Sequence, residues 1–278
     1  MASATQHRPA RMAIIDSGLG GISVVRAIRS SAPELPLIYA ADTAGFPYGG
    51  KSADEITTRG ILMVEALRQQ HRLERVVVAC NTLSTLSLAA LRARFTDIAF
   101  VGTVPAIKVA AERSQTRRFT LLATPNTAHS PYSKSLIDQF AEGCVVDAHG
   151  APNLARLSEE YVLGNAITDS AWIEEIAPCF HDDTRGRTDS IILGCTHYPL
   201  VLKELQRLAP WPVNWIDSSE AIARQALRDF ANTGGEASAY VTNGSDCDQY
   251  RTLFAREGLG DCHTLDVNAA PVRAAARA

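Results

Sequence analysis

Residues 75–86 read RVVVACNTLSTL, and this stretch decides the fold. Its three consecutive valines, residues 76–78, form a short β-branched apolar run that is typical of a strand buried on both faces of a parallel sheet. Short polar side chains follow at Asn81, Thr82 and Ser84, where they favour a helix start, and a leucine-rich pattern continues the helix. The sequence therefore predicts that Cys80 lies where a buried strand ends and a helix begins.

This position gives the Cys80 thiol a chemical interpretation. In an open α/β sheet, ligands bind beyond the carboxyl ends of the strands. A helix N-terminus also favours the thiolate, which is the form that removes protons or attacks electrophiles. A buried structural cysteine is the alternative that a single unit of this kind leaves open.

A second stretch repeats the pattern. Residues 190–202 read SIILGCTHYPLVL, so an apolar run again ends in a small residue, Cys195 and a threonine, and a leucine-rich segment follows. About one domain's length of chain separates the two cysteines. We therefore expect an α/β fold of two similar domains with mostly parallel central sheets. Each domain would present one thiol, and the active site would lie in the cleft between them.

Composition sets the broad class. The chain has 278 residues, of which 21% are charged and 46% hydrophobic, as in an ordinary globular protein of one or two domains. The net charge of −3 and the scattered basic residues argue against a nucleic-acid partner. No apolar run approaches the roughly 20 residues that span a bilayer, so we expect no membrane partner. Residues 1–11 are polar and lack the core of a secretion signal, which predicts a flexible lead-in to a cytoplasmic protein.

The six cysteines predict neither a disulfide framework nor a metal site. None of them is spaced as CxxC, so reduced thiols are expected. Cys195 with His197, or Cys262 with His263, supplies only a fragment of a zinc site, which needs four ligands. The remaining cysteines are interpreted as structural: Cys144, Cys179, Cys247 and Cys262. No lysine stands at a strand end beside glycine and serine, which argues against pyridoxal phosphate, and we expect no cofactor.

Polar loops follow other predicted strands. After the strand at 12–16, Ser17 and a glycine-rich turn could hold an anion on backbone amides, but Ser23 stands where a dinucleotide fingerprint needs glycine. Ser52 with Glu55 forms a capping box. Thr103 is expected to cap the helix that begins near residue 105.

Together these motifs resemble the cofactor-independent glutamate racemases. The resemblance rests on DSGLGG at 16–21, CNT at 80–82 and GCTHYP at 194–199, and it extends from about residue 12 to residue 230. Racemisation without a cofactor needs an acid/base group on each face of the substrate Cα, one of them protonated and the other not. The resemblance implies that Cys80 takes the proton from D-glutamate and that Cys195 serves the other face. It also implies that Asp16 and His197 steady or relay the protons of these thiols.

The resemblance further implies where the substrate binds. Ser17, Asn81, Thr82 and Thr196 would hold the α-carboxylate as charge grows on it. A loop formed by Pro47, Tyr48 and Gly49 would cover the substrate. Thr124 and Thr127 would bind the side-chain carboxylate, although alone they read as a helix cap and loop.

Domain organisation and partners also follow from the resemblance. The segment VGTVPAIK at 101–108 is similar to the hinge of family members, so residues 12–104 with 218–278 would form the first domain and 105–217 the second. The resemblance favours activation by a UDP-muramyl peptide, a homodimer, and a role in supplying D-glutamate for peptidoglycan synthesis.

One position departs from the family pattern. Many members have a glutamate just before the helix that corresponds to 154–163, and Pro152 or Asn153 stands there in this chain. Glu159 and Glu160 lie within that helix and are expected to be solvated. A racemase for aspartate or another acidic amino acid, a related lyase, a cysteine hydrolase, and a non-catalytic regulatory protein on the same scaffold remain alternatives. Cysteines on both halves favour racemisation over the lyase, the cysteine hydrolase and the non-catalytic protein.

Overall fold

The computed structural model describes residues 11–231 and 234–268, and its two larger sheets are entirely parallel. The six-stranded sheet has the order β12-β11-β2-β1-β3-β4. Its strands are β1 (Arg11–Asp16), β2 (Leu37–Ala41), β3 (Leu73–Val78), β4 (Ala99–Gly102), β11 (Ser238–Val241) and β12 (Cys262–Thr264). We call the unit built on this sheet the first domain. The expected α/β class with mostly parallel sheets is confirmed.

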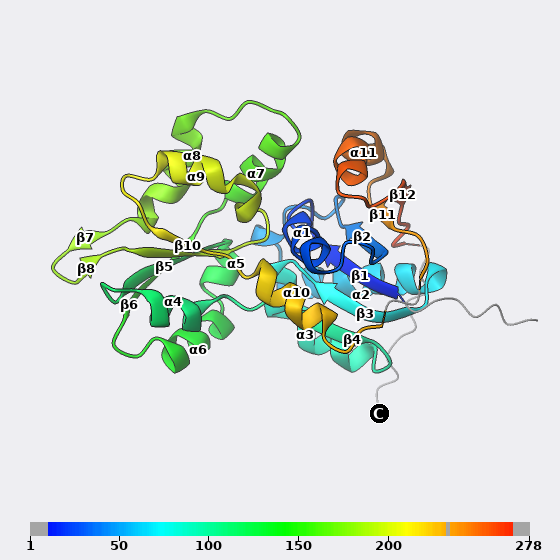
Figure 1. Cartoon of the computed structure of the whole chain (residues 1–278), viewed down its shortest axis with the longest axis horizontal. Coiled ribbons are helices and arrows are strands. Elements are labelled where there is room, and N and C mark those ends of the chain that lie inside the picture. Colours follow the sequence, from blue (N-terminus) through cyan, green and yellow to red (C-terminus); the bar gives the residue numbers. More distant parts are fainter. Residues whose placement is uncertain (1–10, 232–233, 269–278) are drawn as a thin grey trace, which may run out of the picture.

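The second domain is built on a four-stranded sheet of order β10-β9-β5-β6. Its strands are β5 (Arg118–Ala123), β6 (Val145–Gly150), β9 (Ser190–Gly194) and β10 (Asn214–Ile216). A short antiparallel pair, β7 (Asp182–Asp183) and β8 (Gly186–Arg187), projects from this domain (Figure 1). The two domains lie side by side along the long axis of the molecule (Figure 1).

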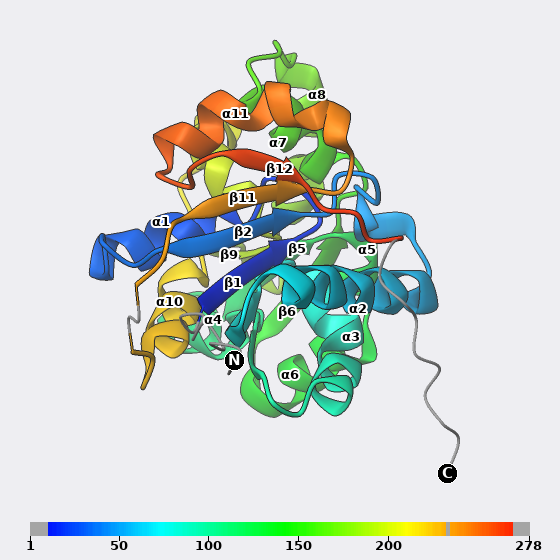
Figure 2. The ribbon, with the colours of Figure 1, turned by 90° about the vertical axis from the view of Figure 1, so that its right-hand side faces the viewer.

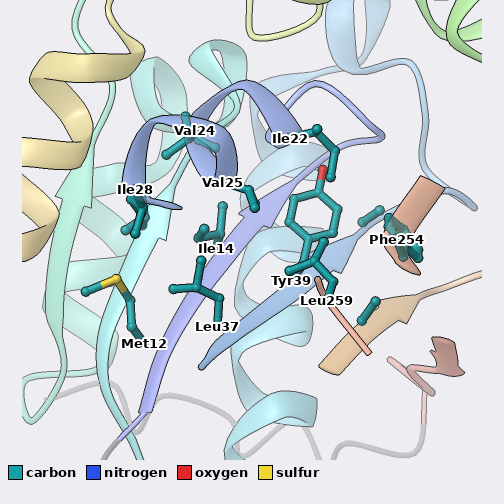
Figure 3. Close-up of a cluster of buried hydrophobic side chains, with 14 of the residues drawn as sticks. Met12, Ile14, Ile22, Val24, Val25, Ile28, Leu37, Tyr39, Phe254 and Leu259 are labelled. Atoms are coloured by element: carbon teal, nitrogen blue, oxygen red, sulfur yellow. The ribbon is translucent and has the colours of Figure 1, made fainter. Parts of the chain in front are cut away.

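Helices cover both faces of the first sheet (Figure 2). Helices α1 (Ile22–Ser31), α10 (Ser219–Leu227) and α11 (Cys247–Arg256) pack on one face, and α2 (Ala53–Gln70) with α3 (Asn81–Arg94) covers the other. Figure 3 shows the first of these cores, in which Ile14 and Leu37 of the strands meet Val25 of α1 and Phe254 of α11. Because each strand is covered on both sides, a continuous valine run such as 76–78 suits β3.

The second sheet is also covered on both faces. The helices on one face are α4 (Ile107–Arg113), α5 (Pro125–Ala128) and α6 (Pro131–Phe140), and those on the other are α7 (Leu154–Val162), α8 (Asp169–Ile176) and α9 (Leu202–Leu208). Single 3-10 turns lie at η1 (Tyr48–Gly50), η2 (Ala177–Cys179), η3 (Tyr198–Val201) and η4 (Gly244–Asp246). None of the helices among residues 11–231 and 234–268 has the length and apolar character that crossing a membrane requires.

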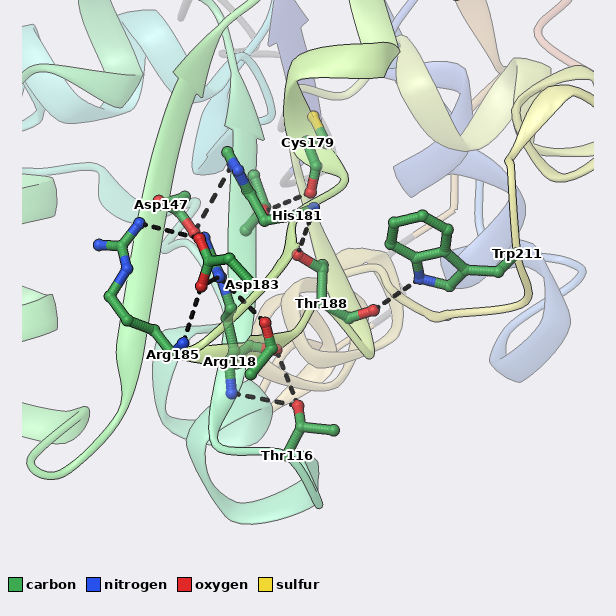
Figure 4. A network of polar contacts seen from close by, with 11 residues as sticks. Thr116, Arg118, Asp147, Cys179, His181, Asp183, Arg185, Thr188 and Trp211 are labelled. Carbon is green, nitrogen blue, oxygen red and sulfur yellow. Dashed lines mark hydrogen bonds and ion pairs between the residues drawn. The ribbon is translucent and has the colours of Figure 1, made fainter.

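A fully buried arginine holds the far edge of the second domain together (Figure 4). The guanidinium of Arg118 donates to Asp147 at 3.1 Å, to Asp183 at 2.6 Å and to the carbonyl of Gly186 at 3.0 Å. These contacts connect β5, β6 and the β7–β8 pair. A buried charge is tolerated only where it is paired in this way.

Local predictions had mixed outcomes. The Ser52 capping box is confirmed, since its hydroxyl accepts the Glu55 amide. Thr103 caps no helix: α4 begins at Ile107, and the Thr103 hydroxyl donates instead to the carbonyls of Val78 and Ala79, each at 2.9 Å. The strand β1 begins at Arg11, which was expected to belong to the flexible lead-in, and the rest of the predicted lead-in lies outside the described residues.

Candidate functional site

The two thiols of interest line one narrow cavity between the domains. It lies at the carboxyl ends of β1, β3, β5 and β9. Its free volume is only about 20 Å³, which is roughly the room that one water molecule needs. Its lining residues are Ser17, Phe46, Pro47, Tyr48, Gly49, Cys80, Asn81, Thr82, Thr124, Pro152, Ala155, Cys195, Thr196 and His197. The structure thus brings together all of the predicted site residues except Asp16 and Thr127, which lie directly behind the wall. An amino acid is larger than this space, so the site must widen to admit one.

Cys80 stands at the junction that its sequence predicted. It is the N-cap of α3, its sulfur accepts the Leu83 amide at 3.5 Å, and its thiol faces the Ser17 hydroxyl at 3.6 Å. The expected bias toward thiolate is wrong for this state. Burial and then the charge of Asp16 raise the pKa of Cys80 to about 12, and these effects outweigh the Leu83 and Ser17 hydrogen bonds that lower it. Cys80 is therefore a protonated thiol here.

Cys195 has a different environment. Its sulfur lies 3.8 Å from Nδ1 of His197, and Nε2 of the same ring lies 2.6 Å from Oε2 of Glu159. Burial lowers the pKa of His197, but the hydrogen bonds and charges of Cys195 and Glu159 raise it, and the net pKa is well above the usual value. An imidazolium therefore faces the Cys195 sulfur. No regular helix follows this cysteine directly, since the 3-10 turn η3 comes before α9.

Glu159 is the functional residue that sequence reasoning missed. It was expected to be solvated, but it is only 4% exposed, and its carboxylate accepts hydrogen bonds from His197, from the Leu19 amide at 2.9 Å and from the Tyr250 hydroxyl at 2.8 Å. Glu160 does lie at the surface, where it pairs with Arg156. A signal was present, because Ala155, Ser158, Glu159 and Val162 fall on one helical face.

Although Pro152 and Asn153 carry no carboxylate before α7, that of Glu159 lies against His197 in this half of the site. Pro152 lines the cavity. Asn153 is the N-cap of α7, and its amide and side chain donate to the buried Glu175 at 3.0 and 2.9 Å. Glu159 supplies the carboxylate to His197 from the following turns of the helix.

Asp16 links the two domains from below the cavity. Its Oδ1 accepts the Gly18 amide and its Oδ2 accepts the hydroxyl of Thr196, each at 3.0 Å. Burial raises the pKa of Asp16 to about 6, although the charge of His197 and these hydrogen bonds oppose the rise. Asp16 thus sets the environment of Cys80 through its charge and contacts the second domain through Thr196.

Three hydroxyls cluster on the opposite side of the cavity, where Thr82 and Thr124 line it and Thr127 lies behind them. Thr82 of α3 lies 2.9 Å from Thr124 and 3.3 Å from Thr127, and Thr124 donates to Thr127 at 3.1 Å. Thr124 also accepts the Thr127 amide, which confirms its role as a helix cap. Hydroxyls of this kind can donate to a carboxylate that enters the cavity.

A second buried network that the sequence did not predict fixes the loop of Pro47, Tyr48 and Gly49. The Tyr48 hydroxyl donates to Asp42 at 2.5 Å, and Arg59 pairs with both oxygens of the same carboxylate. The loop is thereby attached to the end of β2 and to α2. Within the residues that the structure describes, no group of three or more histidine, cysteine, aspartate or glutamate side chains is placed to hold a metal ion.

Comparison with known proteins identifies what this arrangement is similar to. The Asp/Glu/Hydantoin racemase family model matches residues 22–226. A glutamate racemase of Agrobacterium fabrum is 49% identical over 252 residues, which cover 88% of this chain and 92% of that protein. One of Sinorhizobium medicae is 45% identical, with 88% and 93% coverage.

A solved structure agrees with these relatives. The crystal structure of Escherichia coli glutamate racemase, in complex with L-glutamate and the activator UDP-MurNAc-Ala, superposes with a TM-score of 0.85 at 35% identity. The match covers 92% of this chain and 98% of that one. The likeness therefore extends over both domains and the cavity between them.

Proposed function

Because the chain belongs to the Asp/Glu/Hydantoin racemase family, we propose that it interconverts L-glutamate and D-glutamate through Cys80 and Cys195. One observation carries this proposal: two thiols, one from each domain, reach the same closed cavity. A substrate Cα between them would have an acid/base group on each face. Racemisation needs this arrangement, whereas reactions on one face need only one such group.

The surroundings of the two thiols support one starting protonation state for the free protein. Cys80 carries its proton, and the imidazolium of His197 lies beside the Cys195 sulfur, which would act as the base. In this form Cys195 would take the Cα proton of L-glutamate, and Cys80 would deliver its own proton to the other face and give D-glutamate. The reverse reaction needs the opposite protonation, which Asp16 and His197 would restore by holding or releasing protons.

The polar groups of the cavity would hold the substrate as charge develops. Asn81 and Thr82 begin α3, so the free amides and the dipole of this 14-residue helix favour an α-carboxylate there. Ser17 and Thr196 add hydroxyls from both domains, and Thr124 and Thr127 would receive the side-chain carboxylate. Positioned donors of this kind stabilise the carbanionic transition state more than the ground state.

The test is proton exchange with loss of optical activity. The full chain is incubated with L-glutamate in deuterated buffer, and the NMR signal of the Cα proton and the optical rotation are followed. We expect exchange with racemisation in the wild type and in Cys179→Ser, whose thiol is buried outside the cavity, but none in Cys80→Ser or Cys195→Ser. Activity in either cavity mutant would refute the two-thiol mechanism. Exchange with L-aspartate and not L-glutamate would favour the aspartate racemase.

We also propose that a UDP-muramyl peptide activates this chain, as the activator in the Escherichia coli structure suggests. A large groove at the junction of the domains is lined by Lys108, Arg113, Arg224 and Trp215, a set that suits a diphosphate with an attached ring. Rates are measured with and without UDP-MurNAc-Ala in the wild type, in Arg113→Gln and in the control Arg185→Gln on the β7–β8 turn. Activation lost only in Arg113→Gln is expected, and equal rates with and without the peptide in the wild type would refute activation.

The cellular role and assembly state are further proposals. The D-glutamate would serve peptidoglycan synthesis in the cytoplasm, and the chain would form a homodimer. Complementation of a D-glutamate auxotroph tests the first, with Cys80→Ser as the negative control. Light scattering after size exclusion tests the second, and a mass near 29.9 kDa would contradict it.

A further inference from the structure

Glu159 is held from three sides, and only one of its partners is in its own domain. Its Oε2 accepts from His197 of the second domain and from the Leu19 amide of the first. Its Oε1 accepts from the hydroxyl of Tyr250, which lies on α11 of the first domain. Helices α7 and α11, which carry Glu159 and Tyr250, lie on the same side of the molecule (Figure 1). The carboxylate that supports His197 is thus oriented across the domain boundary.

Tyr250 is built into a rigid position. It is 5% exposed, and its ring packs edge-on against Phe254 at 5.8 Å, which in turn packs against Tyr39. Burial and the charge of Glu159 raise the pKa of Tyr250, so its hydroxyl keeps its proton and donates a hydrogen bond to Oε1 of Glu159. Tyr250 is not among the residues that line the cavity. The hydroxyl donates to Glu159, so an effect of this hydroxyl on a bound substrate would pass through Glu159.

We propose that the Tyr250 hydroxyl is a positioning group, which fixes the Glu159 carboxylate against His197 and does so only while the two domains are closed. This inference rests on the proposed function, in which His197 supports Cys195. When the domains separate to admit an amino acid, Glu159 loses its two donors from the first domain at once. The ion pair beside Cys195 is then fully assembled only around an enclosed substrate.

Four titratable groups interact electrostatically with Glu159. They are His197 on the Cys195 loop, Asp16 and Tyr39 of the first domain, and Tyr250 itself, which also faces Asp246. Only His197 and Tyr250 among them donate a hydrogen bond to the carboxylate. Removal of the Tyr250 hydroxyl therefore changes the support of Glu159 without changing any charge near it.

The experiment compares Tyr250→Phe with Tyr240→Phe in the full chain. Both replacements remove one buried hydroxyl from the C-terminal part of the first domain, but that of Tyr240 bonds to His71 on the other face of the sheet. For Tyr250→Phe we expect kcat to fall about tenfold, as for a lost hydrogen bond to a charged group, with KM for glutamate within about twofold. The basic limb of kcat should move to lower pH, because a carboxylate held less firmly against His197 raises the pKa of that imidazole less.

The outcomes are distinct. Equal kcat values and pH profiles in the two variants would overturn the inference. A wild type that does not racemise glutamate would overturn the proposed function instead. In that event, NMR titration of the ¹⁵N-labelled imidazole of His197, assigned with His197→Gln, still tests the positioning. A changed titration midpoint in Tyr250→Phe but not in Tyr240→Phe supports it, and equal midpoints refute it.

Discussion

Replacement of Glu159 by glutamine tests the carboxylate beside His197, which the sequence did not predict. The amide keeps the shape of the carboxylate: its carbonyl oxygen can accept from Leu19 and His197 in place of Oε2, and its NH₂ group can donate to the Tyr250 hydroxyl. Glu159→Gln therefore removes the negative charge and little else. A hydrogen bond to a charged group has a net contribution of about 1.5–3 kcal/mol. We expect kcat/KM to fall by about 10- to 100-fold in both directions.

The assay follows glutamate by circular dichroism from each enantiomer between pH 6 and pH 10. Glu160→Gln is the matched control, because its carboxylate pairs with Arg156 at the surface. The charge of Glu159 helps to raise the pKa of His197, so in Glu159→Gln the imidazolium should be lost at lower pH and the basic limb should move down. A Glu159→Gln profile within about twofold of the control at every pH would refute this account of His197.

The same substitution has a stability signature. A histidine whose pKa is raised on folding adds stability that is fully present below its unfolded-state pKa of about 6.5 and lost as the pH rises through the folded-state pKa. Wild type should therefore exceed Glu159→Gln in the free energy of unfolding most at about pH 6 and least at alkaline pH. Urea unfolding at both ends of this range measures the difference, and a gap that widens with pH would contradict the ion pair.

Three further substitutions test other parts of the structure. Arg118→Met should lower the urea midpoint of the second domain, because it removes the buried donor that joins β5, β6 and the β7–β8 pair. An unchanged midpoint would show that these hydrogen bonds add no stability. Gly18→Ala should lower kcat/KM by about tenfold or more without unfolding the chain, since an added Cβ would collide with the Glu159 carboxylate and the Phe46 ring. Wild-type activity in this variant would show that the site still works when the two domains are held slightly farther apart. The pKa of Asp16 is raised on folding, so the wild type should lose stability as the pH rises from about 4 to about 6, and Asp16→Asn should not show this loss. An identical pH dependence of the free energy of unfolding in both proteins would contradict the burial of Asp16 as an acid.

The parts of the fold that were predictable are those written in short stretches of chain. The valine run of β3, the polar start of α3 and the Ser52 capping box each depend on neighbours within a few residues. Thr103 shows the limit of this reasoning. Its side chain resembles a helix cap, but the end of β3 lies close enough to take its hydrogen bond, and that proximity comes only from the pairing of β3 with β4.

The site required knowledge of the other domain. A glutamate within a helix is normally solvated, and Glu159 is buried only because Leu19 and Tyr250, 140 and 91 residues away in sequence, meet it across the cleft. The two cysteines show a different limit, since similar strand–cysteine–polar sequences lead to opposite surroundings. Cys80 is buried beside an aspartate that opposes its ionisation, while Cys195 faces an imidazolium. This difference arises within each domain: Asp16 ends the strand that pairs with β3, whereas His197 stands two residues after Cys195 in its own motif.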